Sequence, residues 1–271
     1  MLITTITNED LEKEELRFYS ENSEVQLRRC NEPAPGCFIA ESIRVIGRAL
    51  DAGYEAISLL IEERHLNDPL ISRLAGVPVY VGSPQTLSNI AGYKLTGGAL
   101  CLMRRKKLPD VLQVLETARH VVVLEGINNP TNVGAIIRSA AALGMNGALL
   151  THASVDPLTR RAARVSMGTC FQIPWSRATL EQSEGVNLIR LLQSYGFKTV
   201  AMALTEDSTS IDNDEIRANE KLAVIMGSEG PGLPKEVIAA CDYRVMIPMY
   251  HGVDSLNVAA ASAVAFWELM K

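Results

Sequence analysis

One stretch near the end of the chain constrains the fold more than any other. Leu222–Met226 is a continuous apolar run, the pattern of a strand buried on both faces of a mostly parallel sheet. The loop at 227–232 follows at once, and its three glycines and one proline require a sharp turn that exposes backbone N–H groups. Residues 243–247 repeat the strand pattern, and 254–257 open an Ala-rich helix with a hydroxyl-bearing residue at a suitable N-cap. Two strand ends and a helix start therefore converge.

Alternating strand and helix patterns predict an α/β chain of two domains. At 271 residues with 47% hydrophobic residues, the chain is long enough to build two cores. We expect an N-terminal domain with lead-in and linker at 1–117 and a second domain at 118–271. The predicted first-domain strands are 37–40, 56–61, 78–81 and 98–103, with helices at 41–51, 69–74 and 84–90. A linker is expected at 104–118. The second domain is predicted to have strands at 121–124, 148–150 and 199–204, a helix at 132–143 that Asn132 caps, and a helix opened by residues 156–159.

Composition excludes several classes of protein. The formal charge is −5 and there is no long run of like charge, so the charge of the chain does not indicate a nucleic-acid partner. The five cysteines include no close CxxC pair, and the four histidines have no metal-like spacing, so we expect reduced thiols and no metal requirement. The N-terminal residues lack a basic region and a long apolar core, which predicts no signal peptide, no membrane partner and a cytoplasmic location.

Three ordered stretches carry a family resemblance. The segment 129–140 resembles the first motif of the SpoU (TrmH-type) RNA 2′-O-ribose methyltransferases of the SPOUT superfamily. Segments 225–233 and 247–249 with 255–258 resemble that family's second and third motifs, and together the matches cover roughly Val121–Lys271. Near the N-terminus, Phe38–Ser42 and Arg48–Leu50 resemble the small α/β fold of ribosomal proteins that bind kinked RNA.

The resemblance implies a fold, a reaction and a cofactor. It implies an α/β SPOUT-type domain with a deep trefoil knot, a homodimer, and an N-terminal RNA-recognition domain. The implied reaction is methyl transfer from S-adenosylmethionine to a ribose 2′-OH in structured RNA, either rRNA or tRNA. Backbone groups at strand ends can bind adenine without charged side chains. The implied cofactor-binding positions are Leu204, Gly227, Ile247, Met249 and Leu256.

The resemblance also assigns catalytic positions, with Arg138 as the principal one. Arginine stays protonated, with a pKa above ~12, so we interpret Arg138 as a clamp on the phosphate beside the target ribose rather than a static base. The supporting positions are Asn132, Glu229, Ser255 and Asn257. Plain alternatives remain: Arg138 in a surface ion pair, Asn132 and Ser255 as helix caps, Asn257 as a cap or a bridge between loops, and Glu229 as either an orienting group for Arg138 or a tie for its own loop.

Two basic clusters and four rival classes of protein complete the interpretation. Both clusters can contact RNA phosphates, or they can form ordinary solvated faces. They are Arg104–Lys107 and the group Arg160, Arg161 and Arg164. A dinucleotide-binding enzyme is disfavoured because 227–232 does not read GxGxxG, and no P-loop or GxSxG elbow occurs. A catalytically inactive RNA-binding protein that keeps the fold is the other alternative, and intact Arg138 and Asn257 argue against it.

Overall fold

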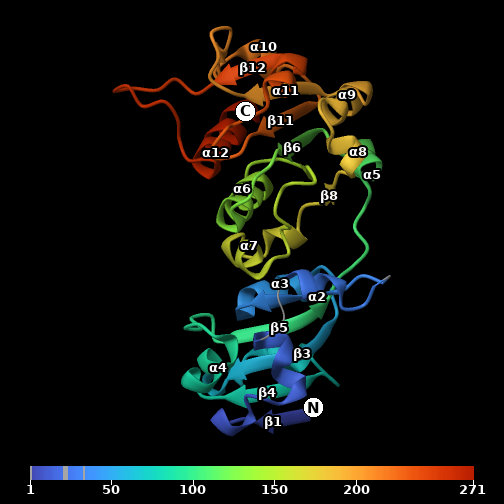
Figure 1. The fold of residues 1–271 in the computed structure, drawn as a ribbon, viewed down its shortest axis with the longest axis vertical. Helices are drawn as coiled ribbons and strands as arrows, with labels where there is room; N and C mark the ends of the chain where they lie inside the picture. The colour runs from blue at the N-terminus through green and yellow to red at the C-terminus, as the bar shows by residue number, and fades with distance from the viewer. Residues whose placement is uncertain (1, 21–23, 33) are drawn as a thin grey trace. The chain divides into compact units, whose positions relative to one another are not determined.

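The computed structural model describes residues 2–20, 24–32 and 34–271, and its contacts divide them into two compact units. Unit 1 comprises the residues up to Lys107 together with Leu158–Phe171, and unit 2 comprises Leu108–Pro157 and Gln172–Lys271 (Figure 1). The observed division differs in two ways from the one expected at 117/118. Residues 108–117 belong to unit 2, and the segment 158–171 leaves the second half of the sequence to complete unit 1.

Unit 1 is built on a five-stranded mixed sheet in the order β1–β4–β3–β5–β2. Its strands are β1 (Leu2–Thr5), β2 (Cys37–Glu41), β3 (Ala56–Glu62), β4 (Pro78–Gly82) and β5 (Ala99–Arg104). The sequence predicts the last four. The strand β1 was missed because it is an exposed edge strand with no alternation of buried and exposed residues. Strand β5 runs antiparallel to both β2 and β3, whereas β1 and β3 are parallel to β4.

Short helices cover this sheet. They are α1 (Arg17–Ser20), α2 (Glu24–Arg29), α3 (Ile43–Asp51) and α4 (Pro84–Ala91). Four 3-10 turns lie at Asn8–Asp10, Glu14–Leu16, Glu63–His65 and Pro69–Arg73, so the helix expected at 69–74 is a 3-10 turn instead. Ser83 caps α4, with Pro84 in its first turn, as its sequence indicates.

The segment 158–171 packs on unit 1 through α7 (Arg160–Val165) and a 3-10 turn at Thr169–Phe171. Helix α7 lies against β2, and the turn lies against α3. The ring of Phe171 contacts Phe38 and Tyr54, with centroids 5.7 and 5.0 Å away. Arg48 Nη1 donates to the carbonyl oxygen of Met167 across 2.7 Å. We call 158–171 the excursion.

Unit 2 is built on a seven-stranded parallel sheet in the order β10–β12–β9–β11–β6–β7–β8. Its strands are β6 (His120–Leu124), β7 (Gly147–Leu150), β8 (Trp175–Arg177), β9 (Lys198–Met202), β10 (Thr209–Ser210), β11 (Leu222–Met226) and β12 (Tyr243–Met246). All five residues of β11 are buried, as its apolar run predicts. The short strands β8 and β10 were not predicted from the sequence.

The helices of unit 2 lie on both faces of the sheet. They are α5 (Val111–Thr117), α6 (Pro130–Ala142), α8 (Leu180–Ser183), α9 (Asn187–Ser194), α10 (Asp214–Arg217), α11 (Lys235–Ala240) and α12 (Val258–Leu269). Helices α5, α9 and α11 share one apolar cluster with alternate residues of the central strands. Helices α6 and α12 pack against each other, on the other side of the sheet in Figure 1.

Two local expectations were wrong. The linker expected at 104–118 contains α5, because Val111, Val114 and Leu115 are spaced to bury one helix face and Asp110 caps it. Helix α6 begins at Pro130 rather than Asn132, and the Asn129 side chain caps it. Within the described residues no helix is long and apolar enough to cross a membrane, and all five cysteines are free thiols.

Candidate active site

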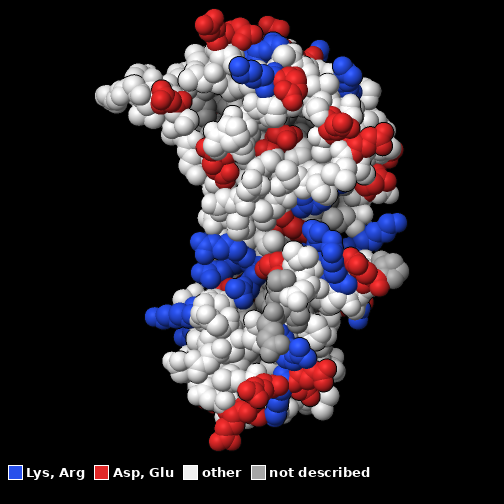
Figure 2. Space-filling view, viewed as in Figure 1, with Lys and Arg blue, Asp and Glu red and all other residues white. Residues whose placement is uncertain are grey.

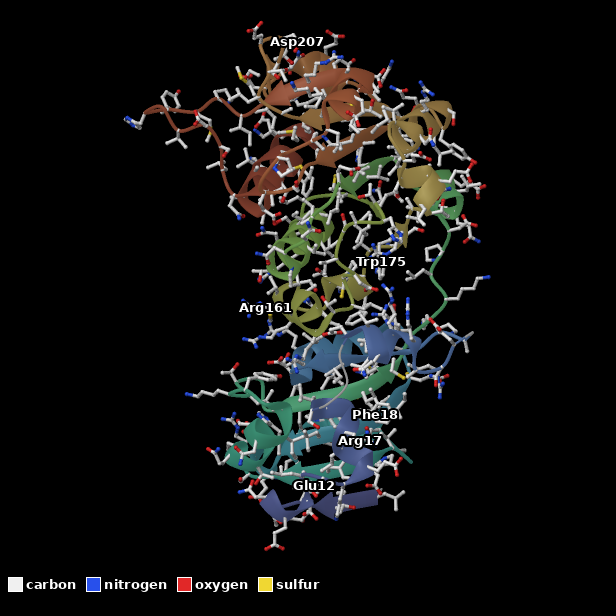
Figure 3. The ribbon with its side chains drawn as sticks, viewed as in Figure 1. Glu12, Arg17, Phe18, Arg161, Trp175 and Asp207 are labelled. Carbon is white, nitrogen blue, oxygen red and sulfur yellow. The ribbon has the colours of Figure 1, made fainter. Side chains whose placement is uncertain are left out.

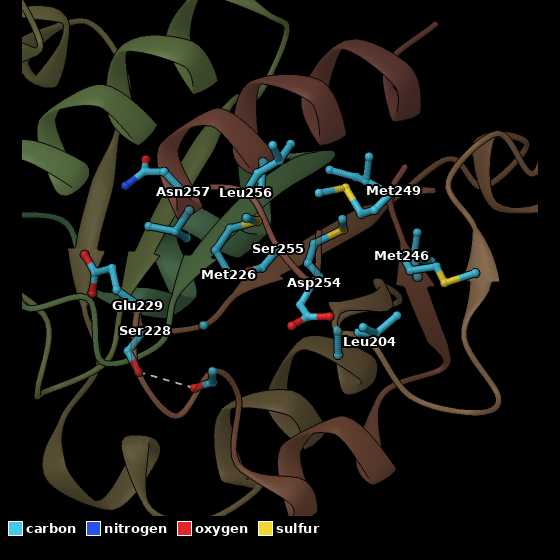
Figure 4. Close-up of a pocket in the computed structure, with 18 of the residues that line it drawn as sticks. Leu204, Met226, Ser228, Glu229, Met246, Met249, Asp254, Ser255, Leu256 and Asn257 are labelled. Atoms are coloured by element: carbon cyan, nitrogen blue, oxygen red, sulfur yellow. Dashed lines mark hydrogen bonds between the residues drawn. The ribbon is translucent and has the colours of Figure 1, made fainter. Parts of the chain in front are cut away.

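A cavity of about 460 Å³ lies in unit 2 where β9, β11 and β12 end (Figure 4). The last residue of each strand, Met202, Met226 and Met246, lines it. Because these strands are parallel, their carboxyl ends meet at one edge of the sheet, where the connecting loops form the remaining walls. The cavity has the size of a small-molecule site.

The glycine-rich loop after β11 forms one wall. A Cβ atom on Gly227 would lie 2.6 Å from the backbone of both Gly232 and Leu233, so only glycine lets the loop fold back on itself. Ser228 Oγ donates to the carbonyl oxygen of Gly232 across 3.4 Å and closes the loop (Figure 4). Gly227 is one of the implied cofactor-binding positions, but the close backbone approach that requires glycine there is made by the loop itself.

A chain of side-chain hydrogen bonds joins the three motifs. Asn132 is 7% exposed, and its Nδ2 donates to Oε1 of Glu229 while its Oδ1 accepts from Nδ2 of Asn257 across 3.3 Å. Asn257 Oδ1 in turn accepts from the amide of Ala259 and caps α12 across 3.0 Å. Asn132 and Ser255 are therefore not the caps that the sequence allowed. Glu229 ties its loop to α6 and is not bonded to Arg138 in the described part of the chain.

Arg138 lies outside this arrangement. It is exposed on α6, and it does not line the cavity. Six positions along an α-helix rotate a side chain by about 600°, so Arg138 and Asn132 point about 120° apart. Among the residues that the structure describes, Arg138 has no hydrogen bond or salt bridge. The surface ion pair considered from the sequence thus has no acidic partner for Arg138 in residues 2–20, 24–32 and 34–271.

The structure brings most of the predicted site residues together. Lining the cavity are the five proposed cofactor positions, Leu204, Gly227, Ile247, Met249 and Leu256, and three proposed catalytic ones, Glu229, Ser255 and Asn257. Asn132 contacts two of these from behind. Sequence reasoning missed Met202, Met226, Met246 and Asp254 as lining residues. The three methionines could have been found from their position at the carboxyl ends of predicted strands.

The cavity is acidic in character. Glu229 and Asp254 contribute carboxylates to its wall, whereas none of the lining residues that the structure describes is lysine, arginine or histidine. A bound phosphate would therefore find no basic side chain, and a ligand with a positive charge would be attracted. No group of three or more metal-binding side chains occurs in the described residues.

The sequence has close counterparts among RNA methyltransferases. It is similar to an uncharacterized tRNA/rRNA methyltransferase of Mycobacterium bovis, with 38% identity over 234 residues that cover 85% of this chain and 79% of the relative. It is also similar to the 23S rRNA (guanosine-2′-O-)-methyltransferase RlmB of Photorhabdus laumondii, with 30% identity over 218 residues that cover 78% of this chain and 86% of that protein.

Solved structures share the fold. The AdoMet-bound rRNA methyltransferase from Sinorhizobium meliloti matches with a TM-score of 0.77 at 22% identity, over 98% of this chain and 97% of that one. The SpoU methyltransferase AviRb from Streptomyces viridochromogenes, in complex with AdoMet, matches with a TM-score of 0.73 at 20% identity, over 94% and 95%. The model of the SpoU rRNA Methylase family matches residues 119–267, which hold β6, α6, the cavity and most of α12. The family resemblance of the three motifs is thereby confirmed, and the chain belongs to the SpoU rRNA Methylase family.

Proposed function

We propose that this protein transfers a methyl group from S-adenosylmethionine to a ribose 2′-OH in structured RNA, either rRNA or tRNA. The observation that carries the proposal is the cavity wall, which offers two carboxylates and no basic side chain among the described lining residues. A sulfonium cation is attracted by such a wall. A dinucleotide or a nucleoside triphosphate brings phosphates, which this wall would repel.

The strand ends would hold the cofactor. Backbone N–H and C=O groups at Leu204, Gly227, Ile247, Met249 and Leu256 can bond the edge of an adenine ring, while the methionine side chains supply apolar surface for its faces. When bound, S-adenosylmethionine supplies an electrophilic methyl group. The residues fit this cofactor because the cavity combines apolar walls, free backbone polar groups and negative charge.

Arg138 would act on the RNA. Its guanidinium is exposed and unpaired within the described residues, so its five N–H donors can bind the phosphate beside the target ribose. A fixed positive charge there stabilises negative charge that develops on the ribose 2′-oxygen. Asn132, Glu229 and Asn257 would act as positioning residues, because their hydrogen bonds fix the glycine-rich loop and the start of α12. Ser255 would contact the substrate from the cavity wall.

The active form would be a homodimer that packs through α12. Ala260, Val264 and Trp267 are exposed at helical spacing, with Val264 39% and Trp267 61% exposed. This apolar stripe continues from Leu256 on the cavity wall, so a second copy seated on it would close the edge of the site. Phe266, on the same helix, is fully buried within its own chain and lies outside this stripe.

Three further features complete the proposal. Unit 2 would contain the deep trefoil knot of SPOUT proteins, an expectation supported by the family and by the packing of the last helix α12 against α6. Unit 1 would be the RNA-recognition domain. The protein would work in the cytoplasm without a metal ion.

Calorimetry and methyl transfer test the function. We expect S-adenosylmethionine and its demethylated product to bind once per chain in the presence of EDTA, and NADH not to bind. Tritiated methyl groups should then pass to total bacterial RNA, and mapping of ribose methylation should identify the nucleotide. Binding without transfer to any RNA would favour the catalytically inactive alternative, and failure to bind either sulfur compound would remove the methyltransferase proposal.

A further inference from the structure

A buried carboxylate in unit 1 organises two arginines of the excursion. Glu41, at the end of β2, is 1% exposed. Its Oε1 accepts from Nη1 of Arg164 across 2.8 Å, and its Oε2 accepts from the hydroxyl of Tyr93 across 3.0 Å and lies 4.0 Å from Nε of Arg160. The guanidinium of Arg160 also stacks 4.2 Å above the Tyr93 ring. Both arginines are thereby held in fixed orientations.

These arginines keep donors for a ligand. The side chains of Arg160 and Arg164 are 32% and 45% exposed, although each faces the same carboxylate. An arginine carries five N–H donors, and Glu41 engages a minority of them. Arginines held by a buried acid lose little rotamer freedom when they bind an anion, which favours planar, bidentate recognition of phosphate.

The excursion also changes the charge of unit 1. Residues 1–107 contain 13 lysines and arginines against 14 acidic residues, whereas the excursion contains three arginines and no acid. Unit 2 without the excursion has 10 basic and 17 acidic residues. Unit 1, which does not contain the cavity, therefore has an excess of positive charge. It has this excess because α7 and its three arginines belong to it.

More cations surround the Glu41 cluster. Arg161 is exposed on α7 and points away from the fold (Figure 3). Arg44 is exposed one turn before Arg48 on α3, and Lys94 is exposed next to Tyr93. Figure 2 shows blue side chains gathered at the left edge, where α7 and α3 lie. We call Arg44, Lys94, Arg160, Arg161 and Arg164 the α7 basic surface.

The second basic cluster makes its contacts mainly within unit 1. Of Arg104–Lys107, Arg104 lies 3.4 Å from Glu55, and Arg105 Nε donates to the carbonyl oxygen of Cys37. Lys106 Nζ donates to the carbonyl oxygen of Ala52 and lies over the Tyr54 ring. Three of these four side chains are therefore engaged within unit 1.

We propose that the α7 basic surface binds the phosphate backbone of the RNA substrate, with Glu41 as the residue that positions Arg160 and Arg164. This inference rests on the proposed function for its choice of RNA as the partner. The contacts are with phosphate and carry affinity rather than base specificity, since the surface presents cations and a single aromatic ring that is already covered by Arg160.

Salt dependence of RNA binding tests the surface. The double variant Arg44→Gln, Arg161→Gln keeps Arg164 and Tyr93, which donate to Glu41. The variant Arg190→Gln, Lys235→Gln removes the same charge from exposed positions of unit 2. Binding of a fluorescein-labelled RNA stem–loop is followed by anisotropy at increasing KCl. Each lost phosphate contact should reduce the slope of log K against log salt by about 0.7–0.9, so the first variant should lose about 1.4–1.8 and the unit 2 variant nothing. Arg44→Lys, Arg161→Lys should keep the wild-type slope.

Each outcome bears on the inference separately from the methyltransferase proposal. Three outcomes would overturn the α7 basic surface, whether or not S-adenosylmethionine binds. They are an unchanged slope in Arg44→Gln, Arg161→Gln, equal losses of slope in both Gln double variants, and no RNA binding by the wild type at low salt. A slope that falls only in the first variant supports the surface even if no methyl transfer is found. Circular dichroism of every variant shows whether the fold is retained. If the double variant misfolds, the single variant Arg161→Gln replaces it, and half the loss of slope is expected.

Discussion

Nδ2 of Asn257 lies 3.3 Å from Oδ1 of Asn132, although 125 positions separate these residues in the chain. An amide side chain is both a donor and an acceptor, which lets Asn132 accept from Asn257 and donate to Glu229 at once. The pair therefore fixes the start of α12 relative to α6 and the glycine-rich loop.

Asn132→Asp should damage this connection. The aspartate keeps the acceptor but loses the donor and places a second carboxylate beside that of Glu229, in a position that is 7% exposed. We expect a loss of ~1–3 kcal/mol in the free energy of unfolding, together with weaker binding of S-adenosylmethionine. Urea denaturation and calorimetry measure the two effects.

The matched control is Asn129→Asp, three positions earlier. Asn129 caps α6, and aspartate caps a helix as well as asparagine does. We expect no loss of stability in this variant. Equal destabilisation by both substitutions would mean that the added negative charge near the start of α6 causes the loss, and not the broken hydrogen bonds of Asn132.

Arg138→Ala should stop methyl transfer and leave cofactor affinity nearly unchanged, because Arg138 does not line the cavity. Loss of a charge-assisted contact made mainly in the transition state costs ~3 kcal/mol, or roughly a hundredfold in rate. Arg138→Lys should stay impaired if the planar fork matters. Arg190→Ala, at another exposed arginine of unit 2, serves as the control. Wild-type methylation by Arg138→Ala would remove its catalytic assignment.

Asp242→Asn should reduce stability in a pH-dependent manner. Burial alone would raise the pKa of Asp242, but hydrogen bonds from the amide and hydroxyl of Thr199, from Lys198 and from Gln193 outweigh it and lower the pKa to about 2 from 3.8. A carboxyl group whose pKa is lower in the folded state stabilises the fold above its unfolded pKa. The difference is worth roughly 2 kcal/mol.

That contribution should vanish as the pH falls from about 4 to about 2. Urea unfolding at pH 7 should therefore separate wild type from Asp242→Asn, and the two should converge near pH 2. Glu116→Gln, at an exposed carboxyl group of α5, should follow the wild type at every pH. A constant difference between wild type and Asp242→Asn across this range would show that the carboxylate charge is not the stabilising element.

Trp267→Glu should dissociate the proposed homodimer without unfolding the chain, since Trp267 is 61% exposed. Sedimentation velocity would then report a monomer. Leu180→Glu changes another exposed apolar residue of unit 2, 68% exposed and outside α12, and should leave the dimer intact.

Deletion from Val258 onward should abolish both the dimer and cofactor binding, because α12 packs on α6 and its first residue lines the cavity. A wild-type protein that sediments as a monomer would reject the interface.

The regular elements and most of the cavity could be predicted from local patterns. The strands β9, β11 and β12 were predicted from the sequence, and their carboxyl ends delimit the cavity. Pro130, in the first turn of α6, marked the true helix start, but the polar Asn132 was taken as the cap instead. The apolar spacing of α5 was likewise present in the sequence, directly after the charged run Arg104–Lys107.

The excursion could not be predicted in this way. Glu41 and Arg164 are 123 positions apart, and neither shows in its own neighbourhood which residue it will meet. A buried glutamate on a strand and a basic six-residue helix are each unusual by themselves. Their pairing is explained only by the three-dimensional contact, because a buried carboxylate requires a compensating charge.

The discontinuity of unit 1 has a consequence for the order of synthesis. Residue 107 leaves the ribosome 64 residues before Phe171 completes the unit. At about 5–20 residues per second, this delay lasts about 3–13 s. During that interval the nascent N-terminal sheet has neither α7 over β2 nor a cation for Glu41, while β6, α6 and β7 are already emerging. The first half of this protein therefore has to wait for part of the second, and a chaperone that shields β2 on the translating ribosome would act in that window.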